Sequence, residues 1–208
     1  MHEGELARIE LWNGDICDLE VDAIVNAANL SLWMATGVGG AIKRAGGDAI
    51  EFAAVRQAPV ELGSAIVTSA GTLAARYVIH AISLDRDRRT SGGAIEAAMR
   101  STFARARELG VISLAFPALG TGVGGFPLDE AARIMVAVTH DELPKSPTID
   151  YLIFALRGVA AYRQFEIALS PDGEPAAPVV PEAPSVPDAS DSPDVSPYLA
   201  GSGAGGPA

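Results

Sequence analysis

Apolar residues in the first 169 positions form short strand-like runs that alternate with segments of helical spacing. The strand-like runs cover residues 8–12, 22–26, 64–69, 77–82, 112–116 and 150–155. Helical spacing covers residues 38–45, 48–56, 94–109, 127–140 and 159–169. Strands and helices alternate except for two consecutive strands near 64–82. This order predicts an α/β domain with helices on both faces of a mostly parallel sheet that has some antiparallel pairing.

Glycine and proline mark several of the expected helix ends. Gly46-Gly47 and Gly110 follow helical segments and are typical of C-terminal caps, and Pro127 suits a first helical position. Lys43 and Arg44 face away from the apolar side of their helix, so we expect them on a solvated face.

Residues 170–208 differ from the rest of the chain. They are rich in Pro, Ala, Ser and Gly, carry six acidic residues, and lack Lys and Arg. Such a composition buries too little apolar surface to offset the entropy of ordering. We therefore expect one domain over residues 1–169 and a disordered acidic tail over 170–208.

The charge and the cysteine content argue against several kinds of binding site. The net charge is −11, and the six acidic residues of the tail leave −5 for residues 1–169. This balance disfavours sequence-independent binding to nucleic acid, so no DNA partner is expected. A single cysteine, Cys17, excludes an internal disulfide and a cysteine-based zinc site, and no cofactor or metal is predicted. Without a signal peptide or a membrane-length apolar run, we expect a cytoplasmic monomer.

Two glycine-rich turns follow predicted strands and precede predicted helices. The first combines Asp22-Ala-Ile-Val-Asn-Ala-Ala-Asn29 with Ala35-Thr-Gly-Val-Gly-Gly-Ala-Ile-Lys43. The second is Phe116-Pro-Ala-Leu-Gly-Thr-Gly-Val-Gly-Gly-Phe-Pro127. A strand, a glycine turn and a helix N-terminus together form an anion-binding unit at the carboxyl edge of a sheet. Two such units predict two walls of one site for a phosphate-bearing ligand.

The segment Gly120–Gly125 also matches the dinucleotide pattern G-x-G-x-x-G. That pattern belongs to an opening strand–helix unit, with an acid at the end of the next strand. Here only one more strand and helix follow, and the nearest acids, Asp141 and Glu142, lie at a helix end. Classical NAD binding is therefore disfavoured, whereas phosphate binding by the loop, or a purely structural tight turn, stays open.

Four polar residues have both a structural and a functional interpretation. The amides of Asn26 and Asn29 suit ribose hydroxyls, but they also satisfy backbone groups at strand ends. Asp15 suits a turn cap, which is the interpretation favoured by its local sequence, or an acceptor for an adenine amino group. His80 lies on an apolar strand and is expected to be a hydrogen-bonded core residue rather than a catalytic one.

Several segments together resemble a macro domain, in the family's order and over roughly residues 8–168. They are Gly14-Asp-Ile16, Val21–Asn29, Gly37–Ile42, Tyr77–His80 and Ala115–Pro127. The resemblance implies a three-layer α/β/α fold with a mixed, largely parallel six-stranded sheet. It also implies an ADP-ribose site in a cleft at the carboxyl ends of the strands.

The resemblance implies a binding module for free or protein-linked ADP-ribose, with an enzymatic alternative. Some members of the family remove ADP-ribose from proteins, dephosphorylate ADP-ribose 1″-phosphate or deacetylate O-acyl-ADP-ribose. A third possibility is a scaffold whose acidic tail recruits a partner. These classes differ in whether the cleft carries a group that activates water.

By position, the resemblance assigns Asp15 to the adenine amino group, Ile16 to the adenine-side wall and Asn29 to the distal ribose. The first glycine turn lies beside that ribose and the phosphates, the second cradles the diphosphate, and Phe154 packs against adenine. Asn29 is also the candidate catalytic residue. The implied ligand-binding set is Asp15, Ile16, Asn26, Asn29, Gly37, Val38, Gly39, Gly40, Gly120, Thr121, Gly122, Val123, Gly124, Gly125, Phe126 and Phe154.

Two positions depart from the branch of the family that hydrolyses ADP-ribosylated carboxylates. Gly39 stands where that branch has an Asp associated with an ordered water, and Gly124 stands where it has an aromatic residue. Loss of the carboxylate removes the obvious general base. Hydrolysis would then depend on Asn29 and the substrate phosphate to position water.

Overall fold

The computed structural model describes residues 7–170. The tail expected from Ser170 onward lies outside the described residues from position 171. Among the helices that are described, none combines the length and apolarity needed to cross a membrane.

A six-stranded sheet forms the centre of the domain, in the order β1-β6-β5-β2-β4-β3. All neighbouring strands are parallel except β3 and β4. The strands are β1 (Arg8–Asn13), β2 (Ala23–Asn29), β3 (Ala65–Ser69), β4 (Tyr77–Leu84), β5 (Ser113–Pro117) and β6 (Tyr151–Leu156). The consecutive strands predicted near 64–82 are therefore the antiparallel pair.

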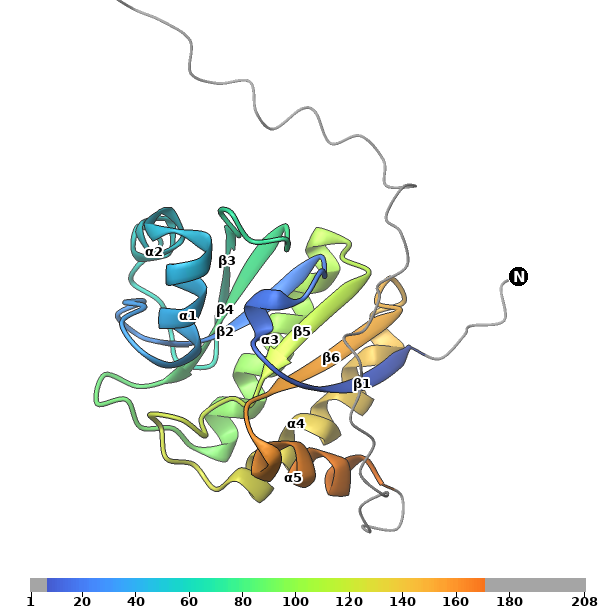
Figure 1. Ribbon diagram of the computed structural model, residues 1–208. Coiled ribbons are helices and arrows are strands. Elements are labelled where there is room, and N and C mark those ends of the chain that lie inside the picture. The colour runs from blue at the N-terminus through green and yellow to red at the C-terminus, as the bar shows by residue number, and fades with distance from the viewer. Residues whose placement is uncertain (1–6, 171–208) are drawn as a thin grey trace, which may run out of the picture.

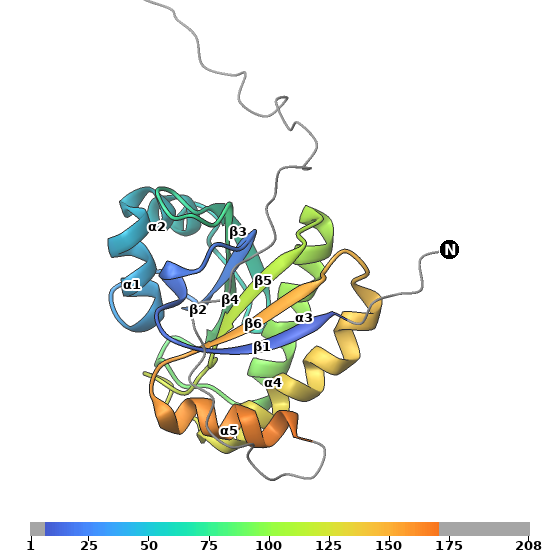
Figure 2. The ribbon, with the colours of Figure 1, turned by 45° about the vertical axis from the view of Figure 1, so that its right-hand side comes forward.

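Helices cover both faces of this sheet (Figures 1 and 2). One face packs against α1 (Gly37–Gly46) and α2 (Asp48–Val55), and the other against α3 (Gly92–Leu109), α4 (Leu128–Glu142) and α5 (Val159–Leu169). Short 3-10 turns cover Ile16–Asp18 and Leu143–Lys145. The arrangement confirms the expected three-layer α/β/α fold with a mixed sheet.

The alternation of side chains along each strand divides the core into two layers. Ile24 of β2 packs with Ile42 and Ile50 beneath α1 and α2. Its neighbour Val25 faces the opposite layer, which contains a chain of aromatic rings. Central strands with both faces covered require the near-continuous apolar runs seen in the sequence.

Helix ends follow the local sequence closely, with small shifts. Gly110 adopts a left-handed conformation, with φ 62°, and ends α3 as expected. Ser91 begins α3 two residues earlier than the apolar spacing indicates, because its hydroxyl accepts a hydrogen bond from the Ala94 N–H. Pro127 is the N-cap of α4 rather than its first helical residue.

The expectation of a fully solvated face was wrong for Lys43. Its Nζ lies 2.6 Å from Oε1 of Glu51, which is buried, and 3.4 Å from Asp48. The other carboxylate oxygen of Glu51 accepts a hydrogen bond from the Met34 N–H at 2.6 Å. Glu51 thereby ties α1 and α2 to the loop that follows β2, and a helical pattern in the sequence cannot reveal such a contact.

The pairing of β2 with β5 is short, and this shapes the carboxyl edge of the sheet. The two strands pair at Ala23–Leu114 and Ile24–Ala115, and no pairing follows among their later residues. β2 leads into α1 on one face, whereas β5 leads into α4 on the other. Adjacent strands whose connections leave on opposite faces create a crevice at their carboxyl ends.

Candidate ligand-binding cleft

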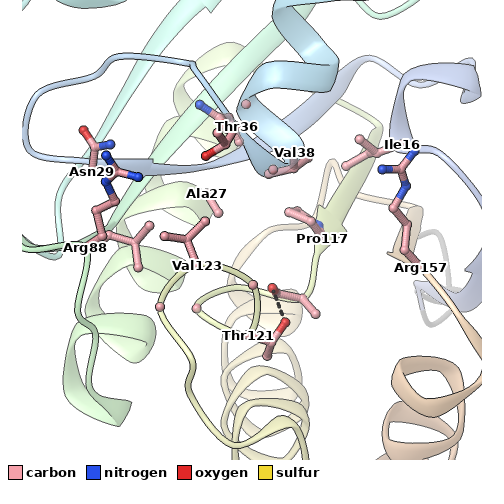
Figure 3. Close-up of a pocket in the computed structure, with 18 of the residues that line it drawn as sticks. Ile16, Ala27, Asn29, Thr36, Val38, Arg88, Pro117, Thr121, Val123 and Arg157 are labelled. Atoms are coloured by element: carbon pink, nitrogen blue, oxygen red, sulfur yellow. Dashed lines mark hydrogen bonds between the residues drawn. The ribbon is translucent and has the colours of Figure 1, made fainter.

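A cleft of about 690 Å³ lies at this crevice, within the size range of small-molecule sites. Its walls come from the end of β2, the start of α1, and the loops that follow β4, β5 and β6. Figure 3 shows Ile16 and Arg157 at one end, Asn29 and Arg88 at the other, and Val38 and Thr121 between them. The cleft is therefore elongated, and its two ends carry different chemistry.

The structure brings most of the predicted site residues to this one cleft. The lining includes Asp15, Ile16, Asn26, Asn29, Gly37, Val38, Gly39, Gly120, Thr121, Gly122, Val123 and Gly124. Both asparagines belong to β2, which continues to Asn29 rather than ending near residue 26, with an irregularity between Ala28 and Asn29.

Four predicted residues do not line the cleft. Gly40 is buried in α1, and Gly125 supplies a turn with φ 60°. Phe126 packs against the core instead. Phe154 is fully buried, with its ring centroid 4.8 Å from that of Phe165. Its position on β6 points it toward α5, so it is its neighbour Ala155 that reaches the cleft.

The second glycine loop offers free backbone donors to the cleft. The N–H groups of residues 121–124 donate to no other described residue. The loop is closed by hydrogen bonds from the Phe126 N–H to the Gly120 carbonyl and from the Gly125 N–H to the Gly122 carbonyl, both 3.1 Å long. Gly120 has a φ of 77°, a conformation that favours glycine. A closed loop with several unpaired N–H groups suits anionic oxygens.

The same loop conformation accounts for the glycine at position 124. A Cβ atom there would lie 2.6 Å from the Gly120 carbonyl oxygen and 2.8 Å from Leu84 Cδ2. An aromatic side chain would therefore require a different loop. A Cβ atom added at Gly122 would meet no atom within 4 Å, so the space there is open.

Across the cleft, α1 begins with glycines and presents its N-terminus. Its N-cap, Thr36, makes no side-chain hydrogen bond to the first turn, so the first N–H groups remain available. A Cβ atom on Gly39 would meet the Oδ1 atom of Asn26 at 3.0 Å. Any side chain at position 39 would therefore begin in tight contact with the Asn26 amide.

Asn26 belongs to a buried polar chain beneath the cleft. Its Nδ2 atom lies 3.1 Å from Nδ1 of His80, and Nε2 of His80 lies 2.9 Å from the Thr68 hydroxyl. Burial lowers the pKa of His80 to about 4, so the imidazole is neutral at pH 7. His80 is the hydrogen-bonded core residue that the apolar strand predicted. The Oδ1 atom of Asn26 is buried and has no partner among the described residues.

Asn29 is held in one orientation. Its Oδ1 atom accepts hydrogen bonds from the N–H and hydroxyl of Ser31, at 2.9 and 2.6 Å. In the described part of the chain, its amide nitrogen has no acceptor. Asn29 therefore offers a hydrogen-bond donor to the cleft.

Asp15 is the turn cap that its local sequence favoured, and it also pairs with an arginine. Its Oδ1 atom caps the 3-10 turn by accepting from the Cys17 N–H at 3.1 Å, and its Oδ2 atom lies 2.6 Å from the Arg157 guanidinium. Burial and then the hydrogen bond with Asp15 raise the pKa of the Cys17 thiol to about 12. Cys17 is therefore protonated at neutral pH and is no nucleophile.

Three arginines of the cleft, Arg86, Arg88 and Arg157, were missed by sequence reasoning. All lie in connections between elements, where no apolar period distinguishes one charged residue from another. A signal was present only for Arg157, which follows the last strand at the edge where the other site residues converge.

Comparisons with known proteins agree with this geometry. The profile of the Macro domain family matches residues 25–135. An uncharacterized protein of Mycobacterium tuberculosis is 46% identical over 164 residues, which cover 79% of this chain and 45% of that protein. The chain thus spans about half the length of this relative. A macro domain-containing protein of Caldanaerobacter subterraneus is 40% identical over 163 residues, covering 74% of this chain and 93% of that protein.

Among solved structures, a Trypanosoma brucei macrodomain in complex with ADP-ribose is similar, with a TM-score of 0.73 and 31% identity. The match covers 78% of this chain and 69% of that one. The family match spans more than half of the 208 residues, and the Caldanaerobacter relative is 40% identical across 74% of this chain. The chain belongs to the Macro domain family.

Proposed function

We propose that this protein binds ADP-ribose, free or attached to another protein, as a recognition module. The observation that carries the proposal is that residues 121–124, whose N–H groups donate to no described residue, line one elongated cleft together with the N-terminus of α1. Two sets of backbone donors on opposite walls suit the two phosphates of a diphosphate. The similar Trypanosoma brucei macrodomain, solved with ADP-ribose, supports this choice of ligand.

The two ends of the cleft fit the two ends of such a ligand. Asp15 and Ile16 would face adenine, with Arg157 covering the purine in place of the aromatic residue that was expected from Phe154. The amide of Asn29 would contact the distal ribose at the opposite end. One molecule of ADP-ribose would then span the cleft from Ile16 to Asn29 and contact both glycine turns on the way.

Hydrolysis of ADP-ribose linkages, including the ADP-ribose 1″-phosphate reaction, is the weaker candidate. Asp15 is the one carboxylate among the described residues that line the cleft, and it is paired with Arg157 at the end away from Asn29. Position 39, where an acid would act as general base, is occupied by glycine, so this carboxylate is missing from the cleft. Recognition without turnover is therefore the function best supported.

Calorimetry with ADP-ribose, using AMP as the comparison, tests the proposal. We expect ADP-ribose to bind more tightly than AMP because only ADP-ribose reaches the glycine loop and Asn29. Absence of ADP-ribose binding at high-micromolar concentration would refute it. Incubation with mono-ADP-ribosylated protein tests the enzymatic alternative, and turnover that is lost in Asn29→Ala would establish it. Cytoplasmic location and a monomeric state remain predictions from the sequence.

A further inference from the structure

The loop between β4 and α3 places two arginines at the Asn29 end of the cleft. Arg86 and Arg88 both line the cleft, and Figure 3 shows Arg88 reaching toward Asn29. The loop is fixed by Asp85, whose Oδ1 atom accepts from the N–H groups of Asp87 and Arg89 at 2.9 and 2.8 Å. The backbone of Arg88 has a φ of 61°, so the loop holds a conformation that a non-glycine residue rarely adopts.

These two guanidinium groups have no internal counter-charge. Arg157 at the other end of the cleft is paired with Asp15, but no carboxylate of the described residues lies within ion-pair distance of Arg86 or Arg88. Both side chains are exposed. Two unpaired, solvent-facing guanidinium groups at the open end of a cleft are suited to carboxylates supplied by a partner.

The same end exposes apolar surface. Trp33 belongs to this end, because its N–H donates to the hydroxyl of Ser31, the residue that also holds Asn29. Trp33 and Val123 both line the cleft, and their exposed fractions are 58% and 51%. Exposed aromatic and arginine side chains are enriched at the centres of protein interfaces. We use the name acceptor rim for this set of four cleft residues, Trp33, Arg86, Arg88 and Val123.

We propose that the acceptor rim binds the polypeptide to which ADP-ribose is attached, and that it selects an acidic segment around the attachment point. The inference rests on the proposed function, because Asn29 at the distal ribose places the attached chain beside Arg86 and Arg88. Charge complementarity identifies the occupant as a peptide rich in Asp and Glu. A nucleic acid is disfavoured, since residues 1–169 carry a net charge of −5 and the two arginines are a small basic surface.

The test compares two peptides that carry ADP-ribose on a central serine, flanked by four Glu or by four Gln residues. Binding of each to the full chain is measured by calorimetry at low and high salt. We expect the Glu peptide to bind about 10-fold more tightly at low salt, and the advantage to shrink at high salt, because exposed ion pairs are screened. In the double variant R86Q/R88Q, the Glu peptide should bind no more tightly than the Gln peptide, or more weakly. The rest of the domain carries a net negative charge, which repels the Glu peptide.

A matched control removes the same charge elsewhere. Arg133 and Arg163 are exposed on α4 and α5 and do not line the cleft. R133Q/R163Q should keep the preference for the Glu peptide. An equal affinity of the unmodified protein for both peptides, with free ADP-ribose still bound, overturns the inference alone. Tighter binding of an ADP-ribosylated oligonucleotide than of the Glu peptide also overturns it, and failure to bind free ADP-ribose removes the proposed function itself.

Discussion

The amide nitrogen of Asn26 lies 3.1 Å from Nδ1 of His80, and this contact fixes the orientation of the Asn26 amide. A neutral imidazole that accepts through Nδ1 carries its proton on Nε2, where it can donate to the Thr68 hydroxyl. With Nδ2 directed to His80, the Oδ1 atom of Asn26 lies buried beside Gly39 at the start of α1. A core histidine thus fixes the orientation of an amide beneath the cleft.

The protonation of His80 should make stability fall in mildly acidic solution. Burial lowers the pKa of His80 from 6.5 to about 4. Between pH 6.5 and pH 4, His80 is therefore protonated in the unfolded chain but mostly neutral in the folded chain. The free energy of unfolding should lose about 3 kcal/mol as the pH falls from 6.5 to 4. Urea unfolding at pH 7, 5.5 and 4 measures this loss. The variant His80→Gln should be less stable at pH 7 but show a shallower decline, and parallel pH profiles for the two proteins would contradict the assignment.

Glu142 should account for a second loss of stability, at a more acidic pH than that of His80. Burial alone would raise its pKa, but hydrogen bonds from Lys145, Arg107 and Arg100 prevail and lower the pKa from 4.5 to about 2. Its stabilisation is therefore complete above pH 4.5 and is lost as the pH falls toward 2. Because the side chain is only 7% exposed, Glu142→Gln should cost about 3 kcal/mol at pH 7, measured by urea unfolding.

An exposed partner of the same arginine provides the comparison for Glu142. Glu96 also pairs with Arg100, but its side chain is 49% exposed. Glu96→Gln should cost less than about 1 kcal/mol, as is usual for solvent-exposed ion pairs. Similar losses for the Glu96 and Glu142 variants would show that burial is not the source of the stabilisation.

Arg157 should control affinity through the purine end of the ligand. Its side chain is 69% exposed, lines the cleft and is positioned by Asp15. A guanidinium plane over a base contributes about 1–2 kcal/mol, so Arg157→Ala should weaken ADP-ribose binding about 10-fold. Calorimetry would measure the change. Arg157→Tyr should recover most of the affinity for ADP-ribose. Arg163→Ala should leave this affinity unchanged, because Arg163 is exposed and lies outside the cleft.

The glycine loop should reject a negative charge at its open position. A Cβ atom at Gly122 meets no atom within 4 Å, so Gly122→Glu should fold normally and place a carboxylate against the proposed diphosphate site. We expect ADP-ribose affinity to fall by at least about 100-fold. Gly93→Glu is the matched control, because Gly93 is equally open but lies on α3 away from the cleft. Unchanged binding by Gly122→Glu would remove the diphosphate from this loop.

The features predicted correctly from the sequence are those that depend on neighbouring residues in the chain. Apolar runs mark central strands, and the glycine turns mark a strand–helix junction, so the two walls of the cleft were predictable. The aromatic residue Phe154 was misplaced because a one-residue difference along a strand changes the face. Lys43 was misjudged because its partner Glu51 is set by the packing of two helices. Charged loop residues such as Arg88 carry no periodic signal at all.

The brief pairing of β2 with β5 has a thermodynamic consequence. The two strands meet at Ala23–Leu114 and Ile24–Ala115 and then separate, so a ligand in the gap would bridge the two halves of the sheet. Occupancy would then be linked to folding by mass action, with about 2.7 kcal/mol gained when the ligand is at 100 times its dissociation constant. The thermal unfolding midpoint, measured with different nucleotides at the same concentration, would therefore rank the nucleotides by affinity. A ligand that binds more tightly across the two strands raises the midpoint further.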